Sequence, residues 1–256
     1  MWSRRLAPGV LLLPLAFLVF RDAPAGLVPP AQSAIGPVPP RGLPQPAIVS
    51  RAAWHADEAM VKDRPRYTGA AKAVFVHHTG NSNGYDCADA PELIRAVQAE
   101  HIRGEGWDDI GYNFVVDRCG TIYEGRAGGV GRPVRGAHTK GFNADTVGIA
   151  ALGSFGSGTT VPKALADGIA KVAAWKLRPG IDPRGTVELV STNDESLYDK
   201  GEVARLAVIS GHRDSYGTSC PGEVLYELLP VLREKVAELR AKTGRQAATA
   251  RLRPTL

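Results

Sequence analysis

The segment "SGHRDSYGTSCPG", residues 210–222, places His212 and Cys220 on either side of a short loop rich in Gly, Ser and Thr. Imidazole nitrogen and thiolate sulfur are ligands that zinc prefers, and a catalytic zinc site uses three protein ligands and leaves one position open for water. One histidine of the pair His77–His78 would complete that set. The spacing by itself is no standard zinc motif, so a disulfide or an idle thiol at Cys220 remains an alternative.

Short apolar runs predict the strands that would carry these side chains, at 71–78, 112–117, 121–125, 146–152 and 206–212. The second and third runs are separated only by "RCG" and predict a hairpin. Apolar residues at helical spacing predict helices at 91–103, 162–177 and 222–240, the last kinked or split at Pro230. Strands interspersed with helices indicate an α/β fold, a central mixed β-sheet flanked by helices.

Two of the predicted strands end in histidine, at His77–His78 and at His212. Sites in α/β proteins collect at strand ends, because rigid strands aim side chains into the crevice there. Adjacent residues of a strand point to opposite faces, so only one of His77 and His78 can share a metal with His212. Periodicity does not say which. We therefore expect a single domain with a zinc cleft at its strand ends.

The remaining three histidines are expected to lie in different environments. His55 lies in a polar segment and is expected to be exposed. His101 falls on the apolar face of its helix, where a hydrogen-bonded core role is the better interpretation. His138 lies in a Gly-rich loop, "VRGAHTKG".

The first residues, "MWSRRLAPGVLLLPLAFLVFRDAPA", combine a basic start, an apolar run and small residues. This layout predicts a signal peptide over 1–25, with an uncleaved interfacial anchor as the alternative. We therefore expect a secreted, cell-wall-associated protein with no stable membrane span after cleavage. The Pro-rich segment 26–46 predicts an extended linker, 47–243 a single folded domain, and the basic segment 244–256 a disordered tail.

Composition narrows the class of protein. A chain of 256 residues with 44% hydrophobic residues can bury one substantial core. The net charge of +5 is mildly basic, but no Lys/Arg run carries interleaved aromatics, so we expect no nucleic-acid partner. Three cysteines in an exported chain leave one unpaired after a single disulfide. Cys87 and Cys119 bracket the first helix and the start of the hairpin, which favours a bond between them, although pairing of Cys220 with either one stays open.

Four blocks, "VFVHHTG", "GWDDIGYNFVVDRCGTIYEGR", "GAHTKGFNADTVGIAALG" and "SGHRDSYGTSCPG", occur in order. Together they resemble the peptidoglycan recognition protein / type 2 N-acetylmuramoyl-L-alanine amidase family. "SRAAWHAD" resembles the entry segment of that family, and the resemblance covers about residues 48–240. It implies a zinc amidase that cuts the amide between N-acetylmuramic acid and the L-alanine of peptidoglycan stem peptides. We expect it to act as a monomer with peptidoglycan as its partner.

The resemblance also implies a ligand set. The first histidine of "HHT" matches the metal ligand of the family, which selects His77, and His212 and Cys220 match the other two. Non-catalytic members of the family keep the cleft but lose a ligand, typically the cysteine. All three are present here, so catalysis is favoured over a pure recognition module.

Other matches supply the expected catalytic and substrate-binding residues. Tyr112 matches the tyrosine that positions the catalytic water or the oxyanion, and Thr218 stands where some members carry a catalytic lysine. His138 and Arg126 match positions that line the substrate cleft. No carboxylate in the four blocks is an obvious general base.

Overall fold

The computed structural model describes residues 43–251, with side chains described up to residue 245. The predicted signal peptide 1–25 and most of the linker 26–46 lie outside the described residues. The last residues of that linker are described, and Leu43 packs against the main core. The folded part therefore begins slightly before residue 47.

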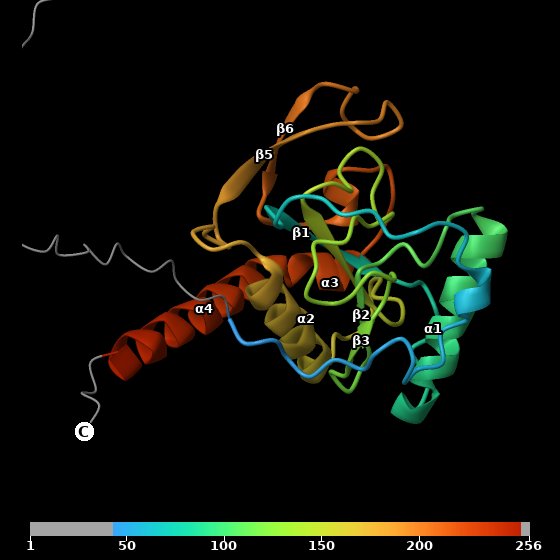
Figure 1. Cartoon of the computed structure of the whole chain (residues 1–256), viewed down its shortest axis with the longest axis horizontal. Coiled ribbons are helices and arrows are strands. Elements are labelled where there is room, and N and C mark those ends of the chain that lie inside the picture. Colours follow the sequence, from blue (N-terminus) through green and yellow to red (C-terminus); the bar gives the residue numbers. More distant parts are fainter. Residues whose placement is uncertain (1–42, 252–256) are drawn as a thin grey trace, which may run out of the picture. The chain divides into compact units, whose positions relative to one another are not determined.

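A five-stranded mixed sheet forms the centre of the described chain (Figure 1). Its strand order is β3-β2-β4-β1-β7, with bounds Ile122–Glu124, Phe114–Val116, Thr146–Ala151, Ala73–His78 and Ile209–Gly211. β4 and β7 run parallel to β1, β2 runs parallel to β4, and β3 is antiparallel to β2. The predicted fold class, a mixed sheet flanked by helices, is confirmed.

Helices α2 (Lys163–Lys176), α3 (Glu223–Glu227) and α4 (Leu229–Arg251) pack on one face of the sheet. This face holds the main core, in which Val74 and Val76 of β1 meet Ile169 of α2 and Leu232 of α4. The strands β1 and β4 are buried almost throughout, as expected for parallel strands covered on both faces. The helix predicted at 222–240 is split between Glu227 and Leu229, with Pro230 in the first turn of α4.

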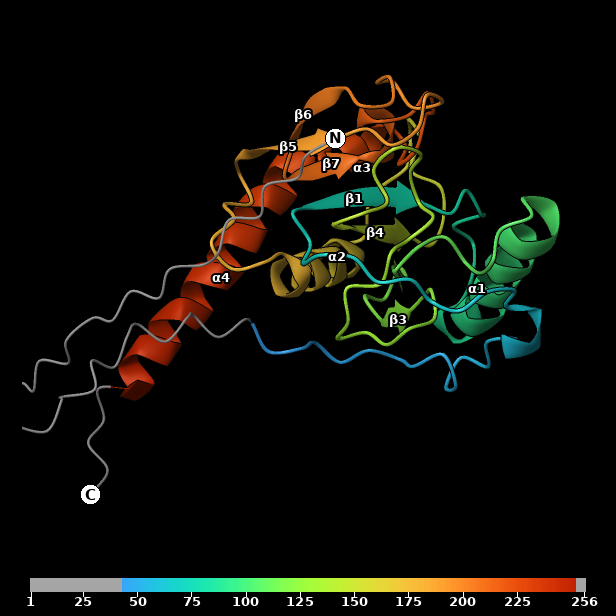
Figure 2. The same cartoon turned by 45° about the horizontal axis from the view of Figure 1, so that its top comes forward.

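The opposite face has two separate covers. Helix α1 (Ala90–Ala99) continues into a π-helical turn (Glu100–Gly104) and packs with Trp54 over β2 and β3. A second, two-stranded sheet of β5 (Thr186–Val190) and β6 (Val203–Ala207) packs over Phe75 of β1. Figure 2 shows β1 running toward the α1 side, with β5 and β6 on the β7 side of the sheet. Short 3-10 turns complete the chain at Glu58–Met60, Cys87–Asp89 and His212–Asp214.

Two expectations about segments were wrong. The run 206–212 is not one strand, because β6 ends at Ala207 and pairs with β5, while β7 starts at Ile209 in the main sheet. The tail expected from residue 244 is helical up to Arg251. Its Ala, Gln and Arg residues have high helix propensity, which favours continuation of α4. Among the described residues, none of the helices has the length and apolar character needed to cross a bilayer.

Candidate zinc site

Three side chains from distant parts of the chain meet at one edge of the main sheet. His77 lies next to the end of β1, His212 follows β7 directly, and Cys220 lies in the loop before α3. One ligand atom from each lies within 4.8 Å of the ligand atoms of the other two. Because β1 and β7 are parallel neighbours, their carboxyl ends bring His77 and His212 together. Two imidazoles and one thiol form a three-ligand set suited to zinc, which leaves a fourth position for water.

His77 is fully buried and continues the row of Ala73 and Phe75 on the face covered by α1 and the β5–β6 sheet. Its Nδ1 lies 3.8 Å from Cys220 Sγ, and its Nε2 lies 3.2 Å from Nδ1 of His138. Burial and the neighbouring histidines hold the pKa of His77 well below its usual range. The neutral ring is the form that binds a metal.

Cys220 is a buried free thiol. Its sulfur accepts a hydrogen bond from the backbone N–H of His78 at 3.3 Å. Burial raises the pKa of the thiol to about 12, although this N–H and Arg213 act in the opposite direction. The structure contains the Cys87–Cys119 disulfide, so the alternative pairings of Cys220 are not seen.

His212 is only half-buried and lies at the start of its 3-10 turn. Its ring stacks on Tyr216 at 5.4 Å between centroids, with 14° between the planes, and its backbone carbonyl accepts from Ser215 Oγ. Burial, and secondarily the charge of His78, lowers the pKa of His212 to about 4. These contacts fix the position of His212 beside His77 and Cys220.

Tyr112 and Thr218 both border the ligand cluster. The Tyr112 hydroxyl donates to the backbone carbonyl of His78 at 3.3 Å, and its ring lies 5.3 Å from that of His77. Burial and the proximity of Cys220 raise the pKa of Tyr112, so its hydroxyl stays a proton donor. The Thr218 hydroxyl oxygen accepts from the backbone N–H of Cys220 at 3.1 Å, which shapes the loop that presents the thiol.

His138, expected to line the substrate cleft, is a buried neighbour of His77. Its side chain is buried, with 3% of the residue exposed, and both ring nitrogens have partners within the protein. It lies directly behind His77, between that ring and Thr146 of β4. The sequence of a Gly-rich loop does not show whether a side chain in it is buried, so the burial of His138 could not be predicted.

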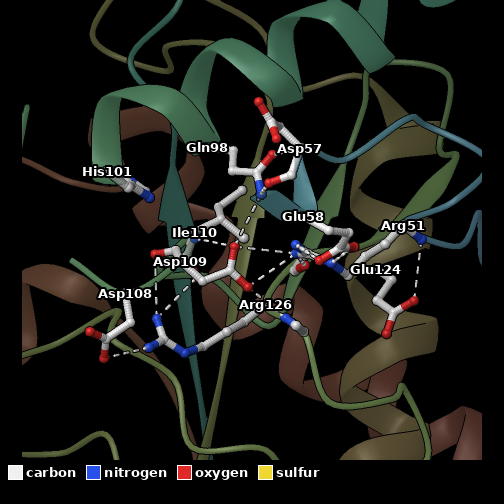
Figure 3. Close-up of polar contacts among 12 residues, drawn as sticks. Arg51, Asp57, Glu58, Gln98, His101, Asp108, Asp109, Ile110, Glu124 and Arg126 are labelled. Atoms are coloured by element: carbon white, nitrogen blue, oxygen red, sulfur yellow. Dashed lines mark hydrogen bonds and ion pairs between the residues drawn. The ribbon is translucent and has the colours of Figure 1, made fainter. Parts of the chain in front are cut away.

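Arg126 is held at the surface by a buried polar network (Figure 3). Its guanidinium donates to the backbone carbonyls of Asp109 and Ile110 and pairs with Asp108 at 3.6 Å. With Arg64, Arg66 and Arg135 it lines a cavity of about 210 Å³. The side chain of Arg126 is 12% exposed, so it is available to that cavity.

The Asp109 carboxylate organises this network from within. It pairs with Arg51 at 3.1 Å and accepts from Gln98 of α1, from Ile110 N–H and from Ala127 N–H. Arg51 also pairs with Glu58 at 2.8 Å. The entry segment, α1 and the loop after β3 are thereby fixed to one another, as Figure 3 shows.

His101 was interpreted from the sequence as a core residue, and it borders the site instead. It is half-buried, its ring lies 4.6 Å from Trp107 and 5.1 Å from Tyr112, and its Nδ1 accepts from Gly111 N–H at 3.0 Å. Burial lowers its pKa to about 4. The expected hydrogen bond is present, but no sequence pattern indicates the contact with Tyr112. His55 is exposed, as expected.

Residues 67–223 match the N-acetylmuramoyl-L-alanine amidase family. The chain belongs to this family. Among its relatives, human peptidoglycan recognition protein 3 is 29% identical over 195 residues, covering 75% of this chain and 48% of the relative. The Drosophila simulans recognition protein SC1a/b is 30% identical over 175 residues, covering 68% of this chain and 80% of the relative. The chain thus spans about half the length of the human protein and most of the insect one.

Solved structures of peptidoglycan recognition proteins have the same fold. Peptidoglycan recognition protein-LE, solved in complex with tracheal cytotoxin, superimposes with a TM-score of 0.56 at 28% identity, covering 72% of this chain and 93% of that one. The family match includes His77, His212 and Cys220, and it begins after Arg51.

Proposed function

We propose that this chain is a secreted, cell-wall-associated, zinc-dependent N-acetylmuramoyl-L-alanine amidase that acts as a monomer. The observation that carries the proposal is the meeting of His77, His212 and Cys220 within 4.8 Å. The donor set fits zinc, because two neutral imidazoles and one thiolate offset part of the metal charge and leave a coordination position open. His77, His212 and Cys220 would hold the ion. When bound, zinc polarises a carbonyl and lowers the pKa of water toward neutrality.

Peptidoglycan is the partner that the relatives favour. Recognition protein-LE, 28% identical to this chain, was solved with a fragment described as monomeric diaminopimelic acid-type peptidoglycan. In the proposed reaction, water adds to the carbonyl carbon of the lactyl group and the C–N bond to L-alanine breaks. The products are a muramic acid carboxylate and a stem peptide with a free amine.

Two hydroxyl side chains could assist the proposed hydrolysis. The Tyr112 hydroxyl stays protonated and its ring lies next to that of His77. Its single proton is donated to the His78 carbonyl in this structure, and by turning from that carbonyl the hydroxyl can donate to the oxyanion that develops at the substrate carbonyl. Thr218 uses its oxygen as an acceptor toward Cys220 N–H and keeps its own proton for donation. Neither is a strong base, so proton transfer to the leaving amine is assigned to water organised by these two hydroxyls.

A recognition module without hydrolysis is the second candidate, because the similar proteins are named recognition proteins. Digestion of purified peptidoglycan by zinc-loaded protein, followed by mass spectrometry, separates the candidates. We expect free stem peptides that begin with L-alanine, and none from the Cys220→Ser variant. Release of disaccharides would indicate a glycosidase and refute the amidase. Wall binding in a pull-down without any released peptide would support the recognition module.

A further inference from the structure

The imidazole of His138 bridges the ligand His77 and the strand β4. Its Nδ1 lies 3.2 Å from His77 Nε2, and its Nε2 lies 3.3 Å from the hydroxyl oxygen of Thr146. That hydroxyl is also 2.5 Å from the backbone carbonyl oxygen of Phe142. All three side chains are buried, so these contacts are made without competing water.

The backbone carbonyl of Phe142 determines which atom donates in each of these hydrogen bonds. A carbonyl oxygen only accepts, so the single hydroxyl proton of Thr146 goes to Phe142. The Thr146 oxygen must then accept from an N–H at His138 Nε2. A neutral His138 with its proton on Nε2 has a bare Nδ1, which accepts from His77 Nε2–H. A neutral His77 is left with a bare Nδ1, the nitrogen 3.8 Å from Cys220 Sγ.

The alternative protonation state disfavours a metal. A charged His138 would donate from both nitrogens, which would place the proton of His77 on Nδ1, inside the ligand cluster. No carboxylate among the described residues contacts either ring to stabilise that charge.

The ring of His138 also has no freedom to turn. A Cβ atom on Gly148 of β4 would lie 2.3 Å from His138 Cγ, and one on Gly136 would lie 2.4 Å from His138 Cδ2. Phe75 closes a further side, at 5.9 Å between ring centroids. The imidazole therefore occupies a slot that only glycine at these two positions leaves open.

We propose that Thr146 and His138 are positioning residues that hold His77 in the tautomer whose unprotonated Nδ1 faces Cys220 and His212. The inference rests on the zinc site of the proposed function. It gives His138 a role different from substrate contact. Outer hydrogen-bond partners of this kind orient metal-ligating histidines and set their tautomers.

The hydrogen bonds from His77 through His138 to Thr146 form what we call the relay. The Thr146→Val substitution in the full-length protein tests it, because valine keeps the shape and β propensity of threonine but lacks the hydroxyl. We expect zinc affinity, measured by competition with a chelating dye, to fall about 10- to 100-fold. Thr146→Ser keeps the hydroxyl and should retain the wild-type affinity. Thr159→Val is the matched control, since it removes a hydroxyl that only donates to Gly156 in its own turn, and it should bind zinc as the wild type does.

A second readout needs no substitution. Long-range ¹H–¹⁵N spectra of the zinc-free protein should show the ring proton on Nε2 in both His77 and His138. A proton on His77 Nδ1 overturns the inference, as does wild-type zinc affinity in Thr146→Val. If zinc affinity follows the expected order while no stem peptide is released from peptidoglycan, the relay stands and the proposed hydrolysis fails.

Discussion

Zinc binding should release a single proton from the metal-free protein at about pH 5.5 to 6.5. Burial lowers the pKa of His212 to about 4 and that of His77 well below its usual range, so both rings are already neutral there. Burial raises the pKa of the Cys220 thiol to about 12, so the thiol keeps its proton until the metal displaces it. The affinity must therefore rise with pH, and the thiol alone supplies the dependence.

The size of the change in zinc Kd with pH distinguishes this site from one whose ligands have ordinary pKa values. Release of one proton changes the zinc Kd about tenfold between about pH 5.5 and 6.5. Two histidines with an ordinary pKa of about 6.5 would each add a factor of about 5.5 over the same interval. The same ligands with ordinary pKa values would thus give a change of about 300-fold.

Two measurements test this prediction. Chelator competition at each pH gives the Kd, and calorimetry in buffers of different ionisation enthalpy counts the released protons. The Cys220→Ser variant is the control, because its hydroxyl releases no proton in this range and its weaker zinc binding should be independent of pH. A change near 300-fold in the wild type would show that the histidines are not held neutral, and a flat profile would remove the thiol from the site.

Three further predictions concern single features. Cys220→Ser should lose most of its zinc and all hydrolysis but keep its fold and its binding to peptidoglycan; stoichiometric zinc and full activity would show that Cys220 is no ligand. Tyr112→Phe should lower kcat about 10²- to 10³-fold with zinc content unchanged, and activity within a factor of two would exclude Tyr112 from the mechanism. The double variant Cys87→Ala/Cys119→Ala opens a loop with a separation of 32 residues. It should lose about 3 to 4 kcal/mol in urea unfolding, and a loss below about 1 kcal/mol would contradict the chain-entropy estimate.

The central sheet was predictable because its strands are continuous apolar runs. β1 and β4 are buried on both faces and therefore stand out against their polar flanks. β5 has an exposed face and buries Leu189, so it forms no continuous apolar run, and its short alternation of Val187 and Leu189 with polar residues was not among the predicted strands. The continuous run "LAVISGH" hid the break at Val208, since a change of sheet depends on pairing partners far away in the sequence.

The candidate site was predictable in its ligands and not in their support. Residue types and strand ends pointed to His212, to Cys220 in the following loop and to one histidine of the pair His77–His78, and the family resemblance selected His77. The burial of His138 depends on the space above Gly136 and Gly148, and the place of His101 depends on the loop that brings Tyr112 to it. Such contacts arise only when segments far apart in the chain pack together.

The network around Asp109 limits how far the chain can be truncated from its N-terminal side. Arg51 reaches Asp109 from the entry segment, and Val49 beside it exchanges backbone hydrogen bonds with β3. A chain shortened to begin at residue 67, where the family match starts, would leave the buried Asp109 carboxylate without its guanidinium partner. Removal of one partner of a buried ion pair costs about 3 to 5 kcal/mol. A cut just before Leu43 would leave the Arg51–Asp109 pair intact, whereas a cut just after Arg51 would weaken the attachment of the loop before β2, which carries Asp109 and Tyr112, and of the loop after β3, which carries Arg126.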